Sequence, residues 1–316
     1  MRVSLEKIAE ILKSRNNFYI LTHQYPDGDT LGSAFALCRA LQKIGKKAKV
    51  INNDSISKKY SFLVNSVRKE DFKANSIISV DVAEENLFGP NLKEYFGKVD
   101  VCIDHHKINT DFAKYSYVDS NSAATAQIIY EIINIMGIQW DASIASNLYT
   151  GIATDTGCFR YKNTTSKTHR IASYILDLGA EKDKINKLMF EQKTKEQFIA
   201  ERYIMDSIEF YFGDKVAIIY VTLEMLEKSG ADDSLIDGIA GVPKQIEGVL
   251  VGVTFRQKEE KAFKVSVRTG ENIDASLLCK HFGGGGHENA AGCTLKGPLE
   301  KAKKEFVSYV KEFIGG

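Results

Sequence analysis

The 316-residue sequence contains no long apolar run, and no stretch of it approaches the roughly 20 residues that a membrane-spanning helix needs. Its first residues, MRVSLEKIAEILK, form a short amphipathic helical pattern without the apolar core and cleavage site of a signal peptide. These absences argue against a membrane-embedded or exported protein. We therefore expect a cytoplasmic protein.

Cysteine is scarce, and neither sign of charge is in excess. The cysteines are odd in number and form no C-x-x-C pair, which argues against a disulfide framework and against a zinc ribbon. We expect reduced, buried thiols at all five positions, Cys38, Cys102, Cys158, Cys279 and Cys293. With 42 Lys and Arg against 41 Asp and Glu and 44% hydrophobic residues, the composition excludes a disordered chain.

The first 180 residues alternate short β-rich runs with helical patterns, which favours a parallel α/β sheet. The expected strands are Asn17–His23, Lys49–Asn53, Ser76–Val82 and Val99–Asp104, with a helix over Thr30–Ile44 between the first two. Runs such as FYILTH and VDVCID are almost continuously apolar, as in strands that are buried on both faces.

The pattern changes after a Lys/Glu-rich stretch at 180–210, which is most simply one or two helices. The runs VLVGVTF and FKVSVRT, joined by the charged turn Gln257–Lys261, then predict an antiparallel hairpin in a smaller α+β domain. We therefore expect a metal-binding domain at 1–185, a helical linker at 186–208 and a substrate-binding domain at 209–316.

Carboxylates and imidazoles follow several of the predicted strands. The first strand runs into His23-Gln-Tyr-Pro-Asp27-Gly-Asp29, the third ends in Asp81, the fourth in Asp104-His105-His106, and a later segment contains Asp155 in T-D-T-G. We expect all of them at the C-terminal edge of one sheet, where open parallel sheets bind ligands.

An isolated D-G-D is usually a turn with a helix N-cap, and a lone histidine near a strand is usually structural. Here three of only six histidines lie beside four or five carboxylates, which is more charge than a core buries without compensation. A pair of divalent cations would supply that compensation. Mixed His/carboxylate ligation suits Mn²⁺ better than Mg²⁺, and the absence of cysteine from these motifs disfavours a thiolate zinc site.

The motifs H-x-x-P-D-G-D, V-D, D-H-H and T-D-T-G, in this order, resemble those of the DHH phosphoesterases, which include RecJ nucleases, family II pyrophosphatases and small-RNA nucleases. The segment FGGGGHENAAG at 282–292 resembles the signature of the DHH-associated substrate-binding domain. By its length and by D-T-G-x-F-R-Y at Asp155–Tyr161, the chain is most similar to the bacterial nanoRNases, which also dephosphorylate 3′-phosphoadenosine 5′-phosphate.

The resemblance implies a role for each motif residue. One metal would be bound by His23, Asp27 and Asp81, and the other by Asp29, Asp81, His105 and Asp155. Asp81 would bridge the two ions. Asp104 would orient an imidazole, and His106 would contact the substrate phosphate.

The glycine run of the second domain is either a flexible loop or a cradle of backbone N–H groups for an anionic ligand. His287 and two basic residues on the hairpin favour the cradle, so the expected substrate-binding residues are Arg256, Arg268, Gly284, Gly285, Gly286 and His287. Residues 209–316 contain 14 Lys and Arg against 16 Asp and Glu, a net charge of −2. Because a polymer needs many phosphate contacts, we expect a short ligand.

The expected function is a Mn²⁺-dependent phosphoesterase, with two Mn²⁺ or other divalent cations, that hydrolyses di- to pentanucleotides to nucleoside monophosphates and dephosphorylates 3′-phosphoadenosine 5′-phosphate. The nucleotide would lie in a cleft between the domains. A phosphodiesterase for cyclic dinucleotides or their linear products is the alternative within enzymes, and a catalytically silent nucleotide sensor is the alternative from another class. We expect no membrane partner and no long nucleic-acid partner. The sequence leaves open whether the protein forms a homodimer.

Overall fold

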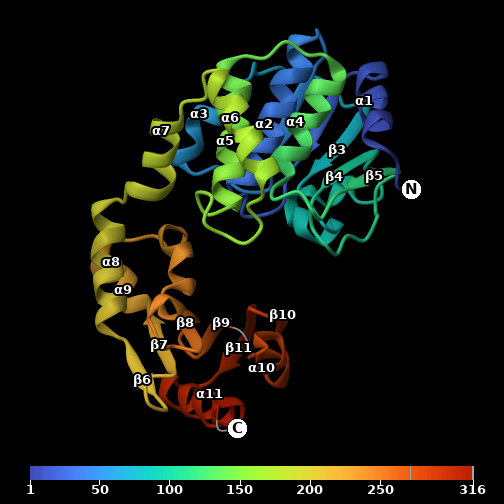
Figure 1. Ribbon diagram of the computed structural model, residues 1–316. Coiled ribbons are helices and arrows are strands. Elements are labelled where there is room, and N and C mark those ends of the chain that lie inside the picture. The colour runs from blue at the N-terminus through green and yellow to red at the C-terminus, as the bar shows by residue number, and fades with distance from the viewer. Residues whose placement is uncertain (271, 315–316) are drawn as a thin grey trace. The chain divides into compact units, whose positions relative to one another are not determined.

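The computed structural model describes residues 1–270 and 272–314, and the chain divides into two compact units, Met1–Gln192 and Lys193–Gly316 (Figure 1). The first unit has the strands β1 (Phe18–Leu21), β2 (Ala48–Ile51), β3 (Ser76–Val80), β4 (Val101–Asp104) and β5 (Tyr115–Val118). Its helices are α1 (Leu5–Ser14), α2 (Gly28–Lys43), α3 (Ser61–Val64), α4 (Thr125–Met136), α5 (Ala142–Asp155), α6 (Ser166–Asp177) and α7 (Lys182–Asn186).

The five strands of the first unit form one parallel sheet in the order β2-β1-β3-β4-β5, which confirms the predicted α/β fold. Helices α2, α4 and α5 lie together over one face (Figure 1). Sequence reasoning did not find β5, because its YSYV run is only partly buried and lacks the continuous apolar character of the inner strands.

The inner strands are buried on both faces, as their apolar runs predict. Ile20, Ile78 and Val101 belong to the core beneath the helices, whereas Leu21 and Cys102 pack on the opposite face. That second face is covered by two 3₁₀ segments, Glu85–Phe88 and Pro90–Tyr95, instead of α-helices.

The strand order places a topological switch point at the carboxyl ends of β1 and β3. The chain leaves β1 for β2 on one side and then returns to β3 on the other. In open parallel sheets this divergence of the connections leaves a crevice for ligands. His23 follows β1 and Asp81 follows β3, so both lie at this point.

Glycines allow α2 and α5 to pack unusually closely. A Cβ atom on Gly32 would lie 2.4 Å from the Asn147 carbonyl oxygen, and one on Gly28 would lie 2.4 Å from Oγ1 of Thr154. This contact brings the end of α5 to the beginning of α2. Asp155 therefore reaches the site from the C-terminal end of a helix and not from the end of a strand.

The second unit contains a six-stranded sheet in the order β10-β11-β9-β8-β7-β6, in which only β7 and β8 are parallel. The strands are β6 (Glu209–Tyr211), β7 (Val216–Val221), β8 (Val251–Glu259), β9 (Ala262–Thr269), β10 (Gly285–His287) and β11 (Ala290–Lys296). The helices are α8 (Lys195–Asp206), α9 (Leu223–Ser229), α10 (Ala275–His281) and α11 (Leu299–Ile314). The antiparallel pairing of β8 with β9 confirms the predicted hairpin.

The Lys/Glu-rich stretch expected to be one or two helices contains α7, a π-helical turn at Lys187–Glu191 and α8. All five cysteines are free, and four are buried; Cys158 is only half-buried, so the expectation of burial fails there. Among the described residues, no helix is both long and apolar enough to cross a membrane.

Replacement of Gly32 by alanine should destabilise the protein, although alanine favours a helix over glycine by up to about 1 kcal/mol. The new methyl group would overlap the α5 backbone, and overpacking of this kind costs about 1–3 kcal/mol. Urea unfolding measures the change. Gly241→Ala, where a Cβ atom meets no neighbour within 4 Å, is the control. Equal stability of Gly32→Ala and the wild type would contradict the close contact.

Candidate metal centre

The four sequence motifs converge into one cluster of carboxylates and imidazoles. The structure groups their potential ligand atoms in three overlapping sets, each with all atoms within 4.8 Å of one another: His23, Asp27 and Asp81; Asp29, His105 and Asp155; and Asp81, His105 and His106. Residues predicted from separate motifs therefore do come together. Asp104 lies outside these sets.

Asp81 lies at the centre of the cluster, and its two oxygens face different histidines. Oδ2 is 3.9 Å from Nε2 of His23, whereas Oδ1 is 3.6 Å from Nε2 of His105. These separations exceed hydrogen-bond range and suit neighbouring ligands placed about 2.0–2.2 Å from a shared cation. The backbone of Asp81 adopts the left-handed region, with φ of 61°, so local strain aims this carboxylate into the cluster.

The two imidazoles that face Asp81 are held in matching orientations. Nδ1 of His23 lies 2.7 Å from the Gln24 carbonyl oxygen, and Nδ1 of His105 lies 3.1 Å from that of Ser122. Although burial opposes the shift, neighbouring carboxylates raise the pKa of His23 to about 9 and also raise that of His105. Since a carbonyl can only accept, each Nδ1 carries a proton, and loss of the second proton leaves the Nε2 lone pair free to bind a cation. This tautomer is the one that a metal ligand needs.

Asp29 is almost completely buried and is held by the first turn of α4. Its carboxylate accepts hydrogen bonds from the backbone N–H groups of Thr125, at 2.7 Å, and Ala126, at 3.0 Å. The side chain of Thr125 donates to Asp81 at 2.9 Å. Sequence reasoning missed Thr125, because a threonine before a helical run resembles an ordinary helix start.

Asp27 is the N-cap of α2, as an isolated D-G-D would predict, and it also lies in the cluster. Its Oδ1 caps α2 by accepting from the backbone N–H groups of Asp29 and Thr30. The same oxygen is 3.8 Å from Nε2 of His23. The N-cap and the candidate ligand are therefore one residue, and the positive end of the α2 dipole faces the cluster.

The buried carboxylates of the cluster repel one another, and the pKa values of three of them are raised. Burial, together with repulsion from Asp81, raises the pKa of Asp29 to about 7, and burial with repulsion from Asp27 raises that of Asp81 to about 6. Burial and the charge of Asp29 raise the pKa of Asp155 to about 7. A bound cation would stabilise the ionised form of these buried carboxylates and lower their pKa values. The donor set therefore fits a divalent metal.

Asp104 and His106 form a separate pair at the edge of this cluster. Nδ1 of His106 donates to Oδ1 of fully buried Asp104 at 2.7 Å, and Asn109 donates to its other oxygen at 2.6 Å. The bond to Asp104 raises the pKa of His106 to about 9, although burial opposes the shift. His106 is thus a half-exposed imidazolium. Asn109, only five residues after Asp104, was not predicted.

The sequence matches two known domain families, which together cover most of the chain. The DHH family N-terminal domain matches residues 17–152, and the DHHA1 domain matches residues 213–316. A bifunctional oligoribonuclease and PAP phosphatase NrnA from Thermus thermophilus is 32% identical over 96% of this chain and 93% of that protein. The chain belongs to the DHH family of phosphoesterases.

Solved structures agree with this assignment at the level of the fold. An exopolyphosphatase-related protein from Bacteroides fragilis superposes with a TM-score of 0.88 at 23% identity, over 98% of this chain and 96% of that one. The exonuclease RecJ bound to manganese gives a TM-score of 0.56 at 13% identity, over 98% and 94% of the two chains. The fold of these structures is therefore shared over 98% of this chain.

In the DHHA1 domain, strand register aligns two of the predicted substrate-binding residues. Arg268 on β9 lies opposite Ala290 on β11, which lies opposite His287 on β10. Directly opposed residues share one face of a sheet, so Arg268 and His287 lie on the same face, on either side of Ala290. Because neighbouring strands are about 5 Å apart, the backbones of Arg268 and His287 are about 10 Å apart. Among the described residues, no carboxylate forms an ion pair with the Arg268 guanidinium, which donates to the Val267 carbonyl at 3.0 Å.

The other predicted substrate-binding residues are arranged differently. Nε of Arg256 lies 3.0 Å from a carboxylate oxygen of Asp233, so this guanidinium already has an anionic partner. The N–H of Gly284 donates to the Cys279 carbonyl at 2.9 Å and is engaged within the protein. Glycine is needed at Gly284 and Gly286 because a Cβ atom would overlap β11, whereas Gly285 lies in open space.

The stability of metal-free protein should fall as pH rises from about 5 to about 8. The folded pKa values of Asp29, Asp81 and Asp155 lie above the ordinary value of 3.8, so the folded state holds protons that unfolded chains release. This stabilisation is complete below about pH 4 and is lost as pH rises through about 7. Thermal unfolding should show a decrease in Tm of about 5 °C or more.

Saturating Mn²⁺ should flatten this dependence, because the cation replaces the protons. An Asp155→Asn variant without metal should show a shallower slope than the wild type. A metal-free Tm that rises over the same range would contradict the charge distribution described above.

Proposed function

We propose that this chain is a dinuclear, Mn²⁺-dependent phosphoesterase that hydrolyses di- to pentanucleotides to nucleoside monophosphates and dephosphorylates 3′-phosphoadenosine 5′-phosphate. The observation that carries the proposal is Asp81, whose two oxygens face the imidazoles of two different ligand groups. That geometry suits one carboxylate bridging two ions. The substrate class is supported by the Thermus thermophilus relative, which is named as an oligoribonuclease and PAP phosphatase.

The proposed ligands of one ion are His23, Asp27 and Asp81, and those of the other are Asp29, Asp81, His105 and Asp155. Two such ions would activate a water molecule and neutralise the oxygens of the phosphoryl group during in-line displacement. The backbone N–H groups at the start of α4 donate to the Asp29 carboxylate and fix its orientation. The Thr125 hydroxyl donates to Asp81, the proposed bridging carboxylate. These contacts orient the ligands before any metal binds.

His106 is the proposed phosphate-binding group of the metal domain. Its Nδ1–H is committed to Asp104, so its Nε2–H is the donor that can reach a phosphate oxygen. The raised pKa keeps the ring cationic at neutral pH, which strengthens a hydrogen bond to an anion. Asp104 would act by holding that ring in place.

The DHHA1 domain supplies a second set of proposed substrate-binding groups. Arg268 lacks a carboxylate partner among the described residues and shares a face with His287, so both are proposed to bind anionic or polar substrate groups. β10 is an edge strand, which leaves some backbone N–H groups near Gly285 and Gly286 unpaired with β11. Gly284 and Arg256 stay predictions as substrate contacts, since their donors already have partners.

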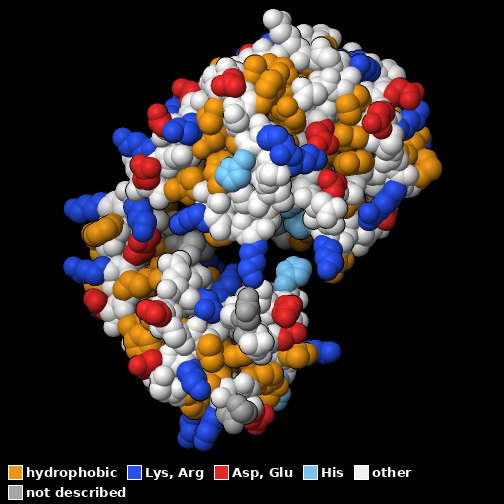
Figure 2. Space-filling view, in the orientation of Figure 1, with side chains coloured by type: hydrophobic (Ala, Val, Ile, Leu, Met, Phe, Trp, Pro, Cys, Tyr) orange, Lys and Arg blue, Asp and Glu red, His pale blue; other side chains and the backbone are white. Residues whose placement is uncertain are grey.

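The surface does not suggest a long polyanion. Figure 2 shows Lys and Arg side chains interspersed with Asp and Glu over the visible face, without an extended area of one sign. The net charge of residues 209–316 is −2, from 14 basic and 16 acidic residues. A polymer-binding protein would need many phosphate contacts.

His106→Ala should keep both metal ions while lowering kcat by roughly 10²–10⁴, the usual scale for a lost acid, base or positioning group. Asp81→Asn is the contrasting variant, because it removes the shared ligand and should lower metal content and rate together. Elemental analysis and steady-state kinetics on the two variants measure this difference. Loss of one ion in His106→Ala would show that His106 is itself a ligand.

A substrate panel tests the function as a whole. Mn²⁺-loaded protein should show its highest kcat/KM on dinucleotides, compared with a 20-mer, cyclic dinucleotides, pyrophosphate and 3′-phosphoadenosine 5′-phosphate. Arg268→Ala should raise KM for dinucleotides about tenfold, and Lys264→Ala, on the same strand, is the control. A 20-mer cleaved with higher kcat/KM than a dinucleotide would refute the short-substrate proposal, and no turnover of any member would favour the silent sensor.

A further inference from the structure

The loop that follows α5, directly after candidate ligand Asp155, has a strained backbone. Gly157, Cys158 and Phe159 occupy the left-handed region in succession, with φ values of 55°, 58° and 64°. Side-chain-bearing residues avoid this region at a cost of roughly 1–2 kcal/mol each. Such strain persists only where the surrounding contacts enforce it, and it is common where a protein shapes a ligand site.

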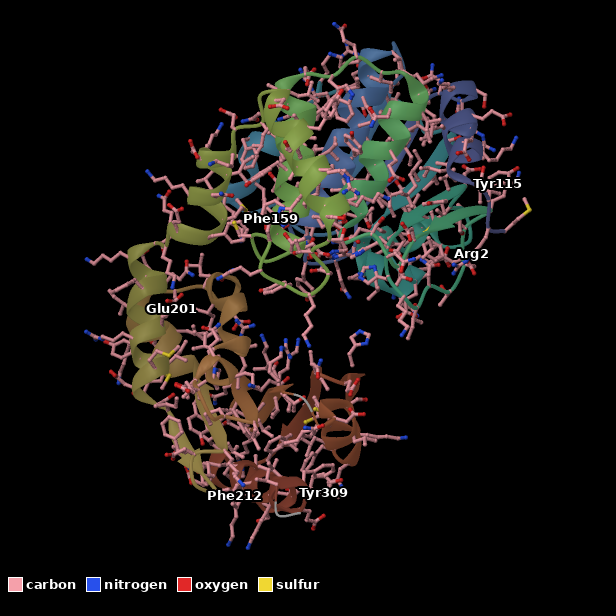
Figure 3. All side chains as sticks on the ribbon, viewed as in Figure 1. Arg2, Tyr115, Phe159, Glu201, Phe212 and Tyr309 are labelled. Atoms are coloured by element: carbon pink, nitrogen blue, oxygen red, sulfur yellow. The ribbon has the colours of Figure 1, made fainter. Side chains whose placement is uncertain are left out.

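Several contacts enforce this loop. The ring of Phe159, labelled in Figure 3, stacks on His169 with centroids 5.3 Å apart and also contacts Tyr149. The N–H groups of residues 160 and 161 both donate to the Thr156 carbonyl, at 2.9 and 3.0 Å. The side chain of Asn163 donates to the Asp155 carbonyl at 3.1 Å, which ties the end of the loop to the candidate ligand itself.

The loop brings the ring of Tyr161 back over Gly157. A Cβ atom on Gly157 would lie 2.3 Å from Cζ of Tyr161 and 2.6 Å from both Cε atoms, so the ring rests directly against this glycine. Tyr161 nevertheless stays 58% exposed. Phe159 anchors the loop in the unit, whereas Tyr161 offers an aromatic surface to solvent. Gly157 is two residues from Asp155, at most about 7 Å along the chain.

We propose that Tyr161 is a stacking platform for the base of the nucleotide whose phosphate lies at the metal centre. In a nucleotide the ribose separates the base from the phosphate by a short distance. One nucleotide could therefore place its phosphate at the metal centre beside Asp155 and its base on the ring of Tyr161. Stacking on a fixed ring accepts any base, since every base has a π-face. This inference rests on the proposed function and adds to it a base-binding residue in the metal domain.

The test compares an ordinary dinucleotide with two matched dinucleotides that lack the base at one position or the other. The enzymes are Mn²⁺-loaded full-length wild type, Tyr161→Phe, Tyr161→Leu and Tyr174→Leu. Tyr174 is the matched control, because it is a partly exposed tyrosine on α6 whose ring packs against Tyr130 and Trp140. Metal content and Tm are measured for each protein, so that a folding or ligand defect is recognised.

Tyr161→Leu should raise KM for the ordinary dinucleotide about tenfold, on the scale of one lost base stack, with kcat within about threefold of wild type. Tyr161→Phe should retain the wild-type KM, as should Tyr174→Leu. For one of the two abasic dinucleotides, wild type and Tyr161→Leu should have the same KM, because the base that stacks is absent.

An equal increase in KM on all three substrates, or no increase on any, would overturn the stacking role while leaving the proposed function intact. A Tyr161→Phe variant as impaired as Tyr161→Leu would also overturn it, since the ring would then not be the interacting group. Wild-type protein that turns over no dinucleotide would refute the proposed function, and the inference with it.

Discussion

The burial of like charges at one end of the parallel sheet is the constraint on which the rest of the structure depends. Asp29 and Asp81 are each less than 5% exposed, and burial raises both of their pKa values, together with repulsion from Asp81 on Asp29 and from Asp27 on Asp81. Desolvating two carboxylates side by side is costly unless hydrogen bonds and cations compensate. The elements around the switch point supply part of that compensation.

The hydrogen-bond donors come from the start of α4, and the positive charge comes from imidazoles and, in our proposal, from metal ions. The first turn of α4 has unpaired N–H groups in any case, so directing them at Asp29 satisfies both partners. Close packing of α2 against α5 at Gly32 then brings Asp155 within 3.5 Å of His105. Helix packing therefore determines the composition of the cluster as much as the strand order does.

Strained backbone occurs around this cluster at Tyr25, at Asp81 and in the loop after α5. Asp81 and the loop at 157–159 both use the left-handed region, the first to direct a carboxylate and the second to place an aromatic ring. In the DHHA1 domain, by contrast, the glycines at 284 and 286 are explained by close packing against β11. These two glycines therefore resemble Gly28 and Gly32 of the first unit, which also allow close packing.

Much of the fold and of the candidate site could be predicted from the sequence, because strand burial, helix caps and ligand chemistry are local properties. The apolar runs identified β1, β3 and β4, and the polar residues after them identified His23, Asp81 and His105. Tertiary structure alone decided that a helix end supplies Asp155, that Thr125 supports Asp81, and that Asp233 engages Arg256. Each of these contacts joins residues that are distant in sequence. Local sequence patterns do not encode such neighbours.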